Sequence, residues 1–161
     1  MRYKVVPGPA DADPLFAARD ALPLVPGSVE DCCTRVRDRT DVPSREDARE
    51  WLTFLQALGL AAETDRGFHR VREDPDRDAL REAFLGNVFG AHEVRDALAA
   101  ADEPLAPDAV FERVRDIVPR WERDRDPGWE SGWRRRVERL LAWGVVFGVF
   151  EEHDEGYTLW D

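Results

Sequence analysis

The chain has 161 residues, enough for one large domain or two small ones but too few for a large multidomain assembly. Hydrophobic residues make up 43% of it, with six Trp and eight Phe, which can fill a core and argues against wholesale disorder. The net charge is −11, and the longest apolar run, residues 140–150, is far shorter than the ~20 residues of a membrane span, so we expect a soluble cytoplasmic protein.

The charged residues are unusual in kind. Asp and Glu number 34 against 23 basic residues, and Lys4 is the single lysine among those 23. This composition resembles that of proteins from halophilic archaea, whose dense carboxylate surfaces keep them in solution at high salt. In such a background a negative net charge does not exclude nucleic-acid binding, so local charge must decide.

Three helices are expected in the first part of the chain. Pro14–Ala21 has a weak helical pattern, and Ser28–Arg39 a stronger one that begins at Ser28. The third helix begins at Ser44, with Asp47 as the partner in a short capping box. Its apolar positions recur at helical spacing: Ala48, Trp51, Leu52, Leu55 and Leu58.

An internal repeat follows this helix. Residues 58–71 align without a gap on residues 147–160, with identical pairs Gly59/Gly148, Glu63/Glu152, Asp65/Asp154 and Gly67/Gly156. In both copies the Asp-x-Gly sequence lies between short extended segments, which predicts a β-hairpin. The chain is therefore expected to contain two copies of one unit.

The second copy is expected to have matching helices upstream of its hairpin. Arg77–Phe89 and His92–Ala101 form one helix or a bent pair, and Pro107–Val118 forms the next. Pro119–Gly132 has the composition of an exposed loop, and an amphipathic helix containing Trp133 and Val137 precedes the hairpin. A boundary near Asp74 gives units 1–74 and 75–161; Arg2–Val6 has the pattern of a short strand that the repeat does not explain.

The order of three helices and a hairpin resembles the winged helix-turn-helix family, in a tandem form of haloarchaeal type. The residues that carry the resemblance are Val42–Leu60 with its hairpin, and Pro104–Val114 with Arg134–Trp160. The resemblance implies a mainly α fold with small β-hairpins, built as two tandem winged-helix-like units. It also implies a non-enzymatic protein that binds double-stranded DNA in transcription regulation, with the third helix in the major groove and the hairpin, or wing, near the backbone.

Arginines on those elements are the candidate DNA contacts. The first copy offers Arg45, Arg49, Arg66, His69 and Arg70, and the second Arg135, Arg136 and Arg139. Residues 1–72 carry 11 basic and 12 acidic residues, whereas residues 73–161 carry 12 and 22. The first copy is therefore the better candidate for nucleic-acid binding.

The alternative is a protein-interaction module that has the winged-helix shape and binds no nucleic acid. The second hairpin supports it, because Glu151–Glu155 would repel phosphates, and a basic run such as Arg134–Arg139 is often only a solvated or salt-bridged face. The candidate partners are duplex DNA, another protein and a second copy of this chain. Of the six tryptophans, Trp121 and Trp129 have the best claim to a surface role.

No catalytic or metal-binding signature is present in the sequence. There is no glycine-rich phosphate loop or serine nucleophile elbow, and His92-Glu93 fails the zinc pattern because residue 96 is Asp. Cys32 and Cys33 are adjacent with no second pair, so we expect reduced thiols on a helix, at least one of them buried. The sequence thus predicts no enzyme activity, no cofactor and no metal.

Overall fold

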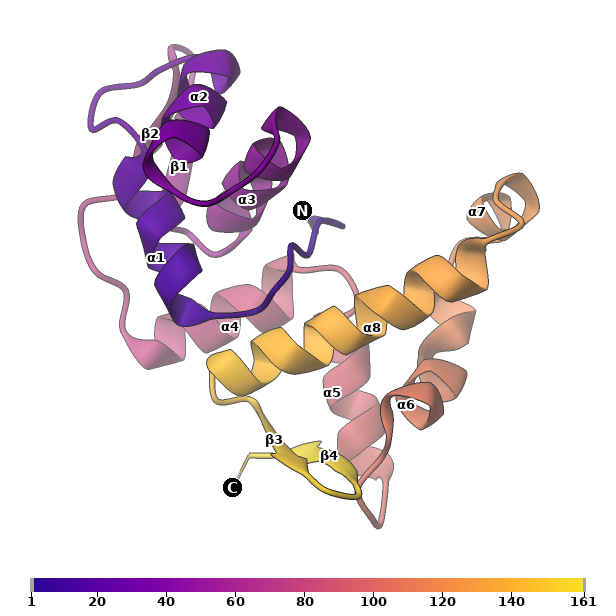
Figure 1. Ribbon diagram of the computed structural model, residues 1–161. Coiled ribbons are helices and arrows are strands. Elements are labelled where there is room, and N and C mark those ends of the chain that lie inside the picture. Colours follow the sequence, from indigo (N-terminus) through magenta and orange to yellow (C-terminus); the bar gives the residue numbers. More distant parts are fainter. Residues whose placement is uncertain (1, 161) are drawn as a thin grey trace. The chain divides into compact units, whose positions relative to one another are not determined.

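The computed structural model describes residues 2–160 and divides into two compact units, the first ending at Phe89 and the second beginning at Gly90. The first unit contains α1 (Ala12–Ala21), α2 (Val29–Arg39), α3 (Arg45–Ala57), β1 (Ala61–Thr64), β2 (Gly67–Arg70) and α4 (Arg77–Asn87), shown in indigo to magenta in Figure 1. The second contains α5 (Ala91–Ala100), α6 (Pro107–Val114), a 3-10 turn η1 (Arg115–Ile117), α7 (Arg120–Arg125), α8 (Trp129–Val146), β3 (Phe150–His153) and β4 (Gly156–Leu159). The prediction of a mainly α fold with two small hairpins is confirmed.

Two helices of the first unit, α2 and α3, begin at side-chain caps that the sequence predicts. The Ser28 hydroxyl accepts from the Asp31 amide at 3.0 Å, and the Ser44 hydroxyl accepts from the Asp47 amide at 3.1 Å. Ser44 also donates to the Asp47 carboxylate at 2.9 Å, which completes the short capping box. The expected apolar face of α3 is buried at all five predicted positions, so periodicity alone oriented this helix correctly.

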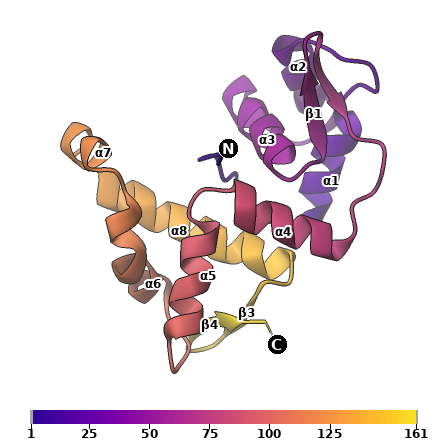
Figure 2. The same cartoon turned by 180° about the vertical axis from the view of Figure 1, so that it is seen from behind.

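The β1–β2 hairpin is antiparallel and is extended by one residue of the α1–α2 connection (Figure 2). Gly27 exchanges two backbone hydrogen bonds with Phe68, at 2.9 and 2.8 Å. The backbones approach closely here: a Cβ on Gly67, whose φ is +124°, would lie 2.2 Å from the Gly27 carbonyl oxygen. Only glycine fits this position without displacing backbone atoms.

The second unit repeats this frame. β3 pairs with β4, and Leu105 exchanges two backbone hydrogen bonds with Tyr157, at 3.0 and 2.8 Å. Gly156 has a φ of +139°, and a Cβ there would lie 2.5 Å from the Leu105 carbonyl oxygen. Apart from α4 in the first unit and η1 and α7 in the second, each unit therefore has the order helix, bridge residue, helix, helix and hairpin, and the expectation of two copies is confirmed.

Equivalent glycines end the helix that precedes the hairpin in each unit. After α3, the Gly59 amide donates to the Gln56 carbonyl and the Leu60 amide to the Leu55 carbonyl. After α8, Gly148 and Val149 make the same two bonds to Val145 and Gly144. This is a Schellman termination, which satisfies carbonyls at the helix end and directs the chain into the hairpin.

The two compact units divide between Phe89 and Gly90, after α4, whereas the sequence predicted a boundary near Asp74. The Asn87 side-chain amide donates to the Ala57 carbonyl at 2.9 Å, and Tyr3 makes backbone hydrogen bonds to Asn87 and Phe89. The Arg2–Val6 segment is thus explained by a bridge between Tyr3 and Val88. Of the two alternatives for residues 77–101, a single helix is not observed: α4 ends at Asn87 and α5 begins at Ala91.

Two predictions for residues 107–132 are wrong. The helix expected to end at Val118 ends at Val114 and continues as the turn η1, and the predicted loop Pro119–Gly132 contains α7 and the first turn of α8. Tertiary contacts fix this segment: the Arg123 guanidinium donates to the Val118 carbonyl at 3.2 Å and stacks over Trp129, 4.8 Å from the ring centroid. Trp129 is therefore half-buried, whereas Trp121 is 60% exposed.

Both thiols lie in the core of the first unit, as expected for at least one of them. Burial, with further contributions from Cys33 and Asp31, raises the pKa of Cys32 to about 11. Burial likewise raises the pKa of Cys33, although the Arg49 guanidinium acts in the opposite direction.

We expect the native protein to react with a thiol reagent such as DTNB at pH 8 on the timescale of unfolding. The thiolate is the reactive form, and both thiols are buried and protonated at that pH. Denatured protein should react at once at two sites. Immediate reaction of native protein would contradict the placement of these side chains.

Candidate nucleic-acid interface

The outward face of α3 carries the first group of predicted contacts. Packing of the apolar face leaves Arg45 and Arg49 exposed on the first two turns. Arg45 forms a two-pronged ion pair with Glu30 of α2. Arg49 forms no ion pair with any residue that the structure describes, so its guanidinium is available to an external anion.

Gln56 also lies on this face and was missed by the sequence reasoning. Gln56 is half-buried and lies seven residues after Arg49, which places the two on one side of the helix. Thr53 lies between them, with its hydroxyl donating to the Arg49 carbonyl at 3.0 Å. Helical spacing from Arg49 is the signal that could have identified Gln56.

Arg66 lies at the tip of the β1–β2 wing, in the two-residue turn with Asp65. Its side chain is exposed, and its backbone amide donates to the Thr64 hydroxyl at 3.1 Å, which fixes the turn. Within residues 2–160 no ion pair involves Arg66. Arg49 and Arg66 are therefore the two predicted arginine contacts of the first unit that form no ion pair with a described residue.

The other two wing candidates, His69 and Arg70, contact residues of their own unit and are half-buried. Arg70 lies 3.6 Å from the Asp20 carboxylate and donates to the Asp20 carbonyl at 3.3 Å, so it faces α1. The Nδ1 atom of His69 lies 2.9 Å from the Arg70 carbonyl oxygen. The five candidates of the first unit thus separate into Arg45, Arg49 and Arg66, which face solvent, and His69 and Arg70, which are half-buried against the unit itself.

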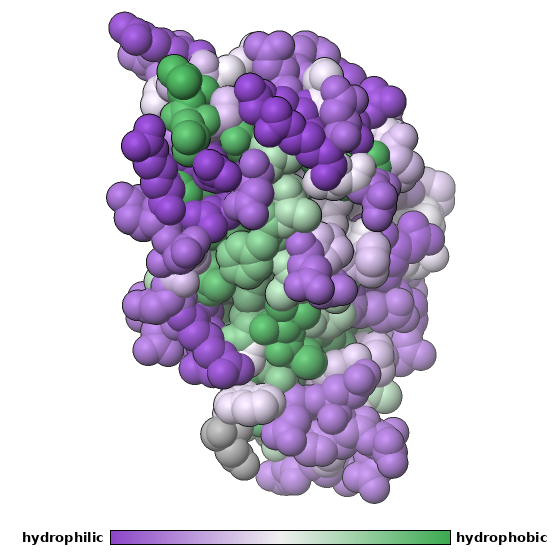
Figure 3. Space-filling model, turned by 60° about the vertical axis from the view of Figure 1, so that its left-hand side comes forward, coloured by the Kyte–Doolittle hydropathy of each residue, from purple (hydrophilic) through white to green (hydrophobic). Residues whose placement is uncertain are grey.

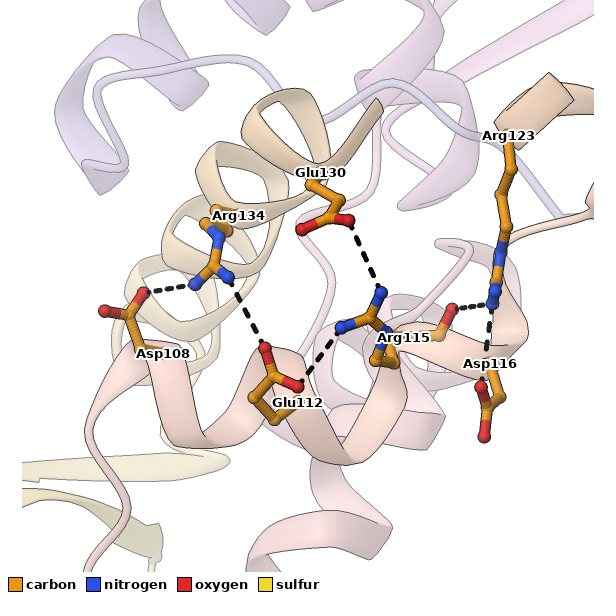
Figure 4. Close-up of polar contacts among 7 residues, drawn as sticks. All are labelled: Asp108, Glu112, Arg115, Asp116, Arg123, Glu130 and Arg134. Atoms are coloured by element: carbon orange, nitrogen blue, oxygen red, sulfur yellow. Dashed lines mark hydrogen bonds and ion pairs between the residues drawn. The ribbon is translucent and has the colours of Figure 1, made fainter. Parts of the chain in front are cut away.

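In the second unit, arginines around α6 and α8 are joined in a charge network (Figure 4). Arg134 lies 3.0 Å from Asp108 and 3.4 Å from Glu112, and Arg115 lies 3.3 Å from Glu112 and 3.4 Å from Glu130. Arg134 also stacks over Phe111, 4.5 Å from the ring centroid. This part of the basic run holds two helices together, as the salt-bridged alternative predicted.

The three predicted contacts on α8 differ in their environment. Arg135 is exposed, Arg139 is half-buried, and Arg136 stacks over Trp133 at 5.2 Å with its Nε atom buried. Burial lowers the pKa of Arg136 to about 10, while Glu122 acts in the opposite direction. Arg136 remains charged at neutral pH but is part of the packing between α7 and α8.

Replacing Arg136 with alanine is therefore expected to lower the free energy of unfolding of the second unit by about 1–3 kcal/mol. The neighbouring Arg135→Ala substitution, at an exposed position, should change it by less than about 0.5 kcal/mol. Urea denaturation of both variants measures the difference. Equal effects would show that the stacking on Trp133 contributes nothing.

The second wing is more acidic than the first, because residues 150–159 contain four acidic residues and no arginine, whereas residues 61–70 contain two acidic and two basic residues. Glu152, Asp154 and Glu155 are exposed on it, and the Tyr157 hydroxyl donates to Glu152 at 2.7 Å. Burial, then this hydrogen bond and the charges of Glu152 and Glu138, raise the pKa of Tyr157 to about 12. Glu155 occupies the tip position that Arg66 occupies in the first unit. A phosphate backbone would be repelled here.

Each unit has the helix order, bridge residue and hairpin of a winged helix, and the chain is a double winged-helix protein. It belongs to the family described as the halobacterial double winged helix domain, whose model matches residues 1–160. The expected tandem winged-helix resemblance of haloarchaeal type is thereby confirmed. No curated protein and no solved structure matches the chain.

Within residues 2–160 no group of three or more His, Cys, Asp or Glu side chains is placed to hold a metal ion. No helix in the described part of the chain is long and apolar enough to cross a membrane.

Proposed function

We propose that the first unit binds double-stranded DNA in a transcription-regulatory role, with α3 in the major groove and the β1–β2 wing near the backbone. The observation that carries the proposal is the pair Arg49 and Arg66. Both are exposed and without an ion pair among the described residues, on the two elements that contact DNA in winged-helix proteins.

The chemistry of the α3 face supports base recognition. A guanidinium such as that of Arg49 can donate to both guanine acceptors in the major groove, and the Gln56 amide suits adenine. Arg45 is paired with Glu30, so it contacts a phosphate at the start of the helix only by exchanging this partner. Arg66 on the wing contacts phosphate or the minor groove.

The second unit is not assigned a DNA contact in this proposal. Arg136 is packed against Trp133, and the wing carries Glu152, Asp154 and Glu155. The acidic wing favours the second candidate function, protein binding, for this unit. The two functions are compatible, because a DNA-binding unit and a protein-binding unit in one chain would bring a partner to DNA.

Fluorescence anisotropy with labelled random duplex DNA tests the proposal across a KCl series. Because phosphate contacts release counterions, the affinity should fall as salt rises, with a logarithmic slope of about −2 to −4 for three or four contacts. The absence of binding at every salt concentration where circular dichroism shows a folded protein would overturn it. Protein binding would then be the function to pursue for both units.

A further inference from the structure

The connection between α1 and α2 exposes two aliphatic side chains at the edge of the small sheet. The Arg70 amide donates to the Pro23 carbonyl at 2.8 Å, and Gly27 pairs with Phe68. Three residues, 24–26, therefore stand opposite the single residue His69 and are pushed out of the ladder as a bulge. Leu24 is 45% exposed and Val25 is 74% exposed.

The second unit shows that the fold does not require aliphatic residues here. Leu105 is the bridge residue equivalent to Gly27, so Asp102, Glu103 and Pro104 occupy the positions of Leu24, Val25 and Pro26. Asp102 and Glu103 are exposed. Because the equivalent positions of the second unit carry two exposed carboxylates, the winged-helix fold does not require aliphatic side chains at Leu24 and Val25.

A pocket of about 410 Å³ adjoins Leu24. It is lined by Arg19, Asp20, Leu24, Arg70, Arg72 and Asp74. Its wall is fixed by the buried Arg19 guanidinium, which donates to the carbonyls of Val71, Arg72 and Glu73 and to the Asp74 carboxylate at 2.6 Å. The view in Figure 3, which brings this side of the first unit forward, shows apolar side chains among polar ones near its upper end.

Two of the three arginines that line this pocket are paired with its two aspartates, and the third is not. Asp74 is paired with Arg19, and Asp20 with Arg70. Arg72 is exposed and forms no ion pair with a described residue. The surface therefore offers an aliphatic contact beside an unneutralised guanidinium, which is complementary to an aliphatic side chain next to a carboxylate.

We propose that Leu24, Val25 and Arg72 form a docking surface for an acidic, aliphatic peptide segment of a partner protein. An aliphatic side chain of the segment packs on Leu24 and Val25, and a carboxylate pairs with Arg72. Duplex DNA is a poor match because its charged backbone does not pack on the two aliphatic side chains. The surface lies at the β2 edge of the sheet, opposite the β1 edge, so it can be occupied independently of the DNA-binding proposal.

The test uses a random peptide library displayed on phage and selected on the immobilised full-length protein at the lowest KCl concentration at which circular dichroism shows it folded, because salt screens exposed ion pairs. Enriched peptides should carry Leu, Ile or Val within a few residues of Asp or Glu. Their affinity should fall by about tenfold or more for Val25→Asp, since a charge would replace the apolar contact. Arg72→Gln should weaken binding less and reduce the preference for acidic peptides.

Matched variants control for charge and folding. Thr34→Asp adds the same charge at an exposed position of α2, and Arg37→Gln removes an exposed guanidinium of α2; both should bind the peptides as the unmodified protein does. The proposal is overturned if no sequence is enriched, if Val25→Asp binds equally well, or if duplex DNA displaces the peptides. Unchanged DNA affinity of Val25→Asp separates this surface from the DNA interface.

Discussion

Replacing Gly67 with alanine should lower the free energy of unfolding of the first unit by about 3 kcal/mol or more. The new Cβ would lie 2.2 Å from the carbonyl oxygen of Gly27, and the residue has a φ of +124°. Neither the strain nor the clash can be relieved by a side-chain movement, because the atoms it meets are backbone. Urea denaturation followed by circular dichroism measures the loss.

Gly86→Ala is the matched control for this substitution. Gly86 lies in α4, and a Cβ there would meet no atom within 4 Å. Alanine should therefore stabilise the first unit by about 0.5–1 kcal/mol through helix propensity. If the Gly67→Ala protein proved as stable as the Gly86→Ala protein, the close packing of Gly67 on the Gly27 backbone would be disproved.

The double substitution Arg49→Glu with Arg66→Glu should reduce the affinity for duplex DNA on the order of 100-fold. It removes one contact from α3 and one from the wing and places two carboxylates near phosphates. The salt slope should become shallower by about 2, since two phosphate or base-edge cations are lost. Anisotropy titrations over the KCl series measure both quantities.

Arg125→Glu with Arg135→Glu gives the same charge change in the second unit, at two exposed positions. Its DNA affinity should stay within a few-fold of that of the unmodified protein. Equal losses in the two double variants would mean that binding follows overall charge, and the assignment of α3 and the first wing would fail. A circular dichroism spectrum of each variant confirms that it is folded.

Local sequence features were sufficient for most of the fold. Ser44 identified the start of α3, and the shared pattern around Gly59 and Gly148 identified both hairpins. These features act over a few residues, within the reach of caps, turns and helical periodicity. The bridge residues Gly27 and Leu105 were not identified, because a single paired residue leaves no periodic pattern.

Helical periodicity predicts which arginines of the candidate interface lie on the exposed side of a helix, and the sequence gives no further information about their contacts. Arg135 and Arg136 are neighbours in the sequence, but Arg135 is exposed, whereas Arg136 lies against Trp133, whose indole donates to Glu122 of α7. The pairing of Arg45 with Glu30 joins residues far apart in the sequence. Such tertiary contacts decide which cations are available, and no local pattern encodes them.

The wing frame has an evolutionary consequence. In both units the hairpin is joined to its bridge residue through backbone amides and carbonyls alone, at Gly27 with Phe68 and at Leu105 with Tyr157. A frame held by main-chain atoms places no demand on the side chain at the tip. After an internal duplication, the two tips could therefore diverge to Arg66 and Glu155 without loss of shape. One copy could keep an ancestral ligand while the other acquired a new one.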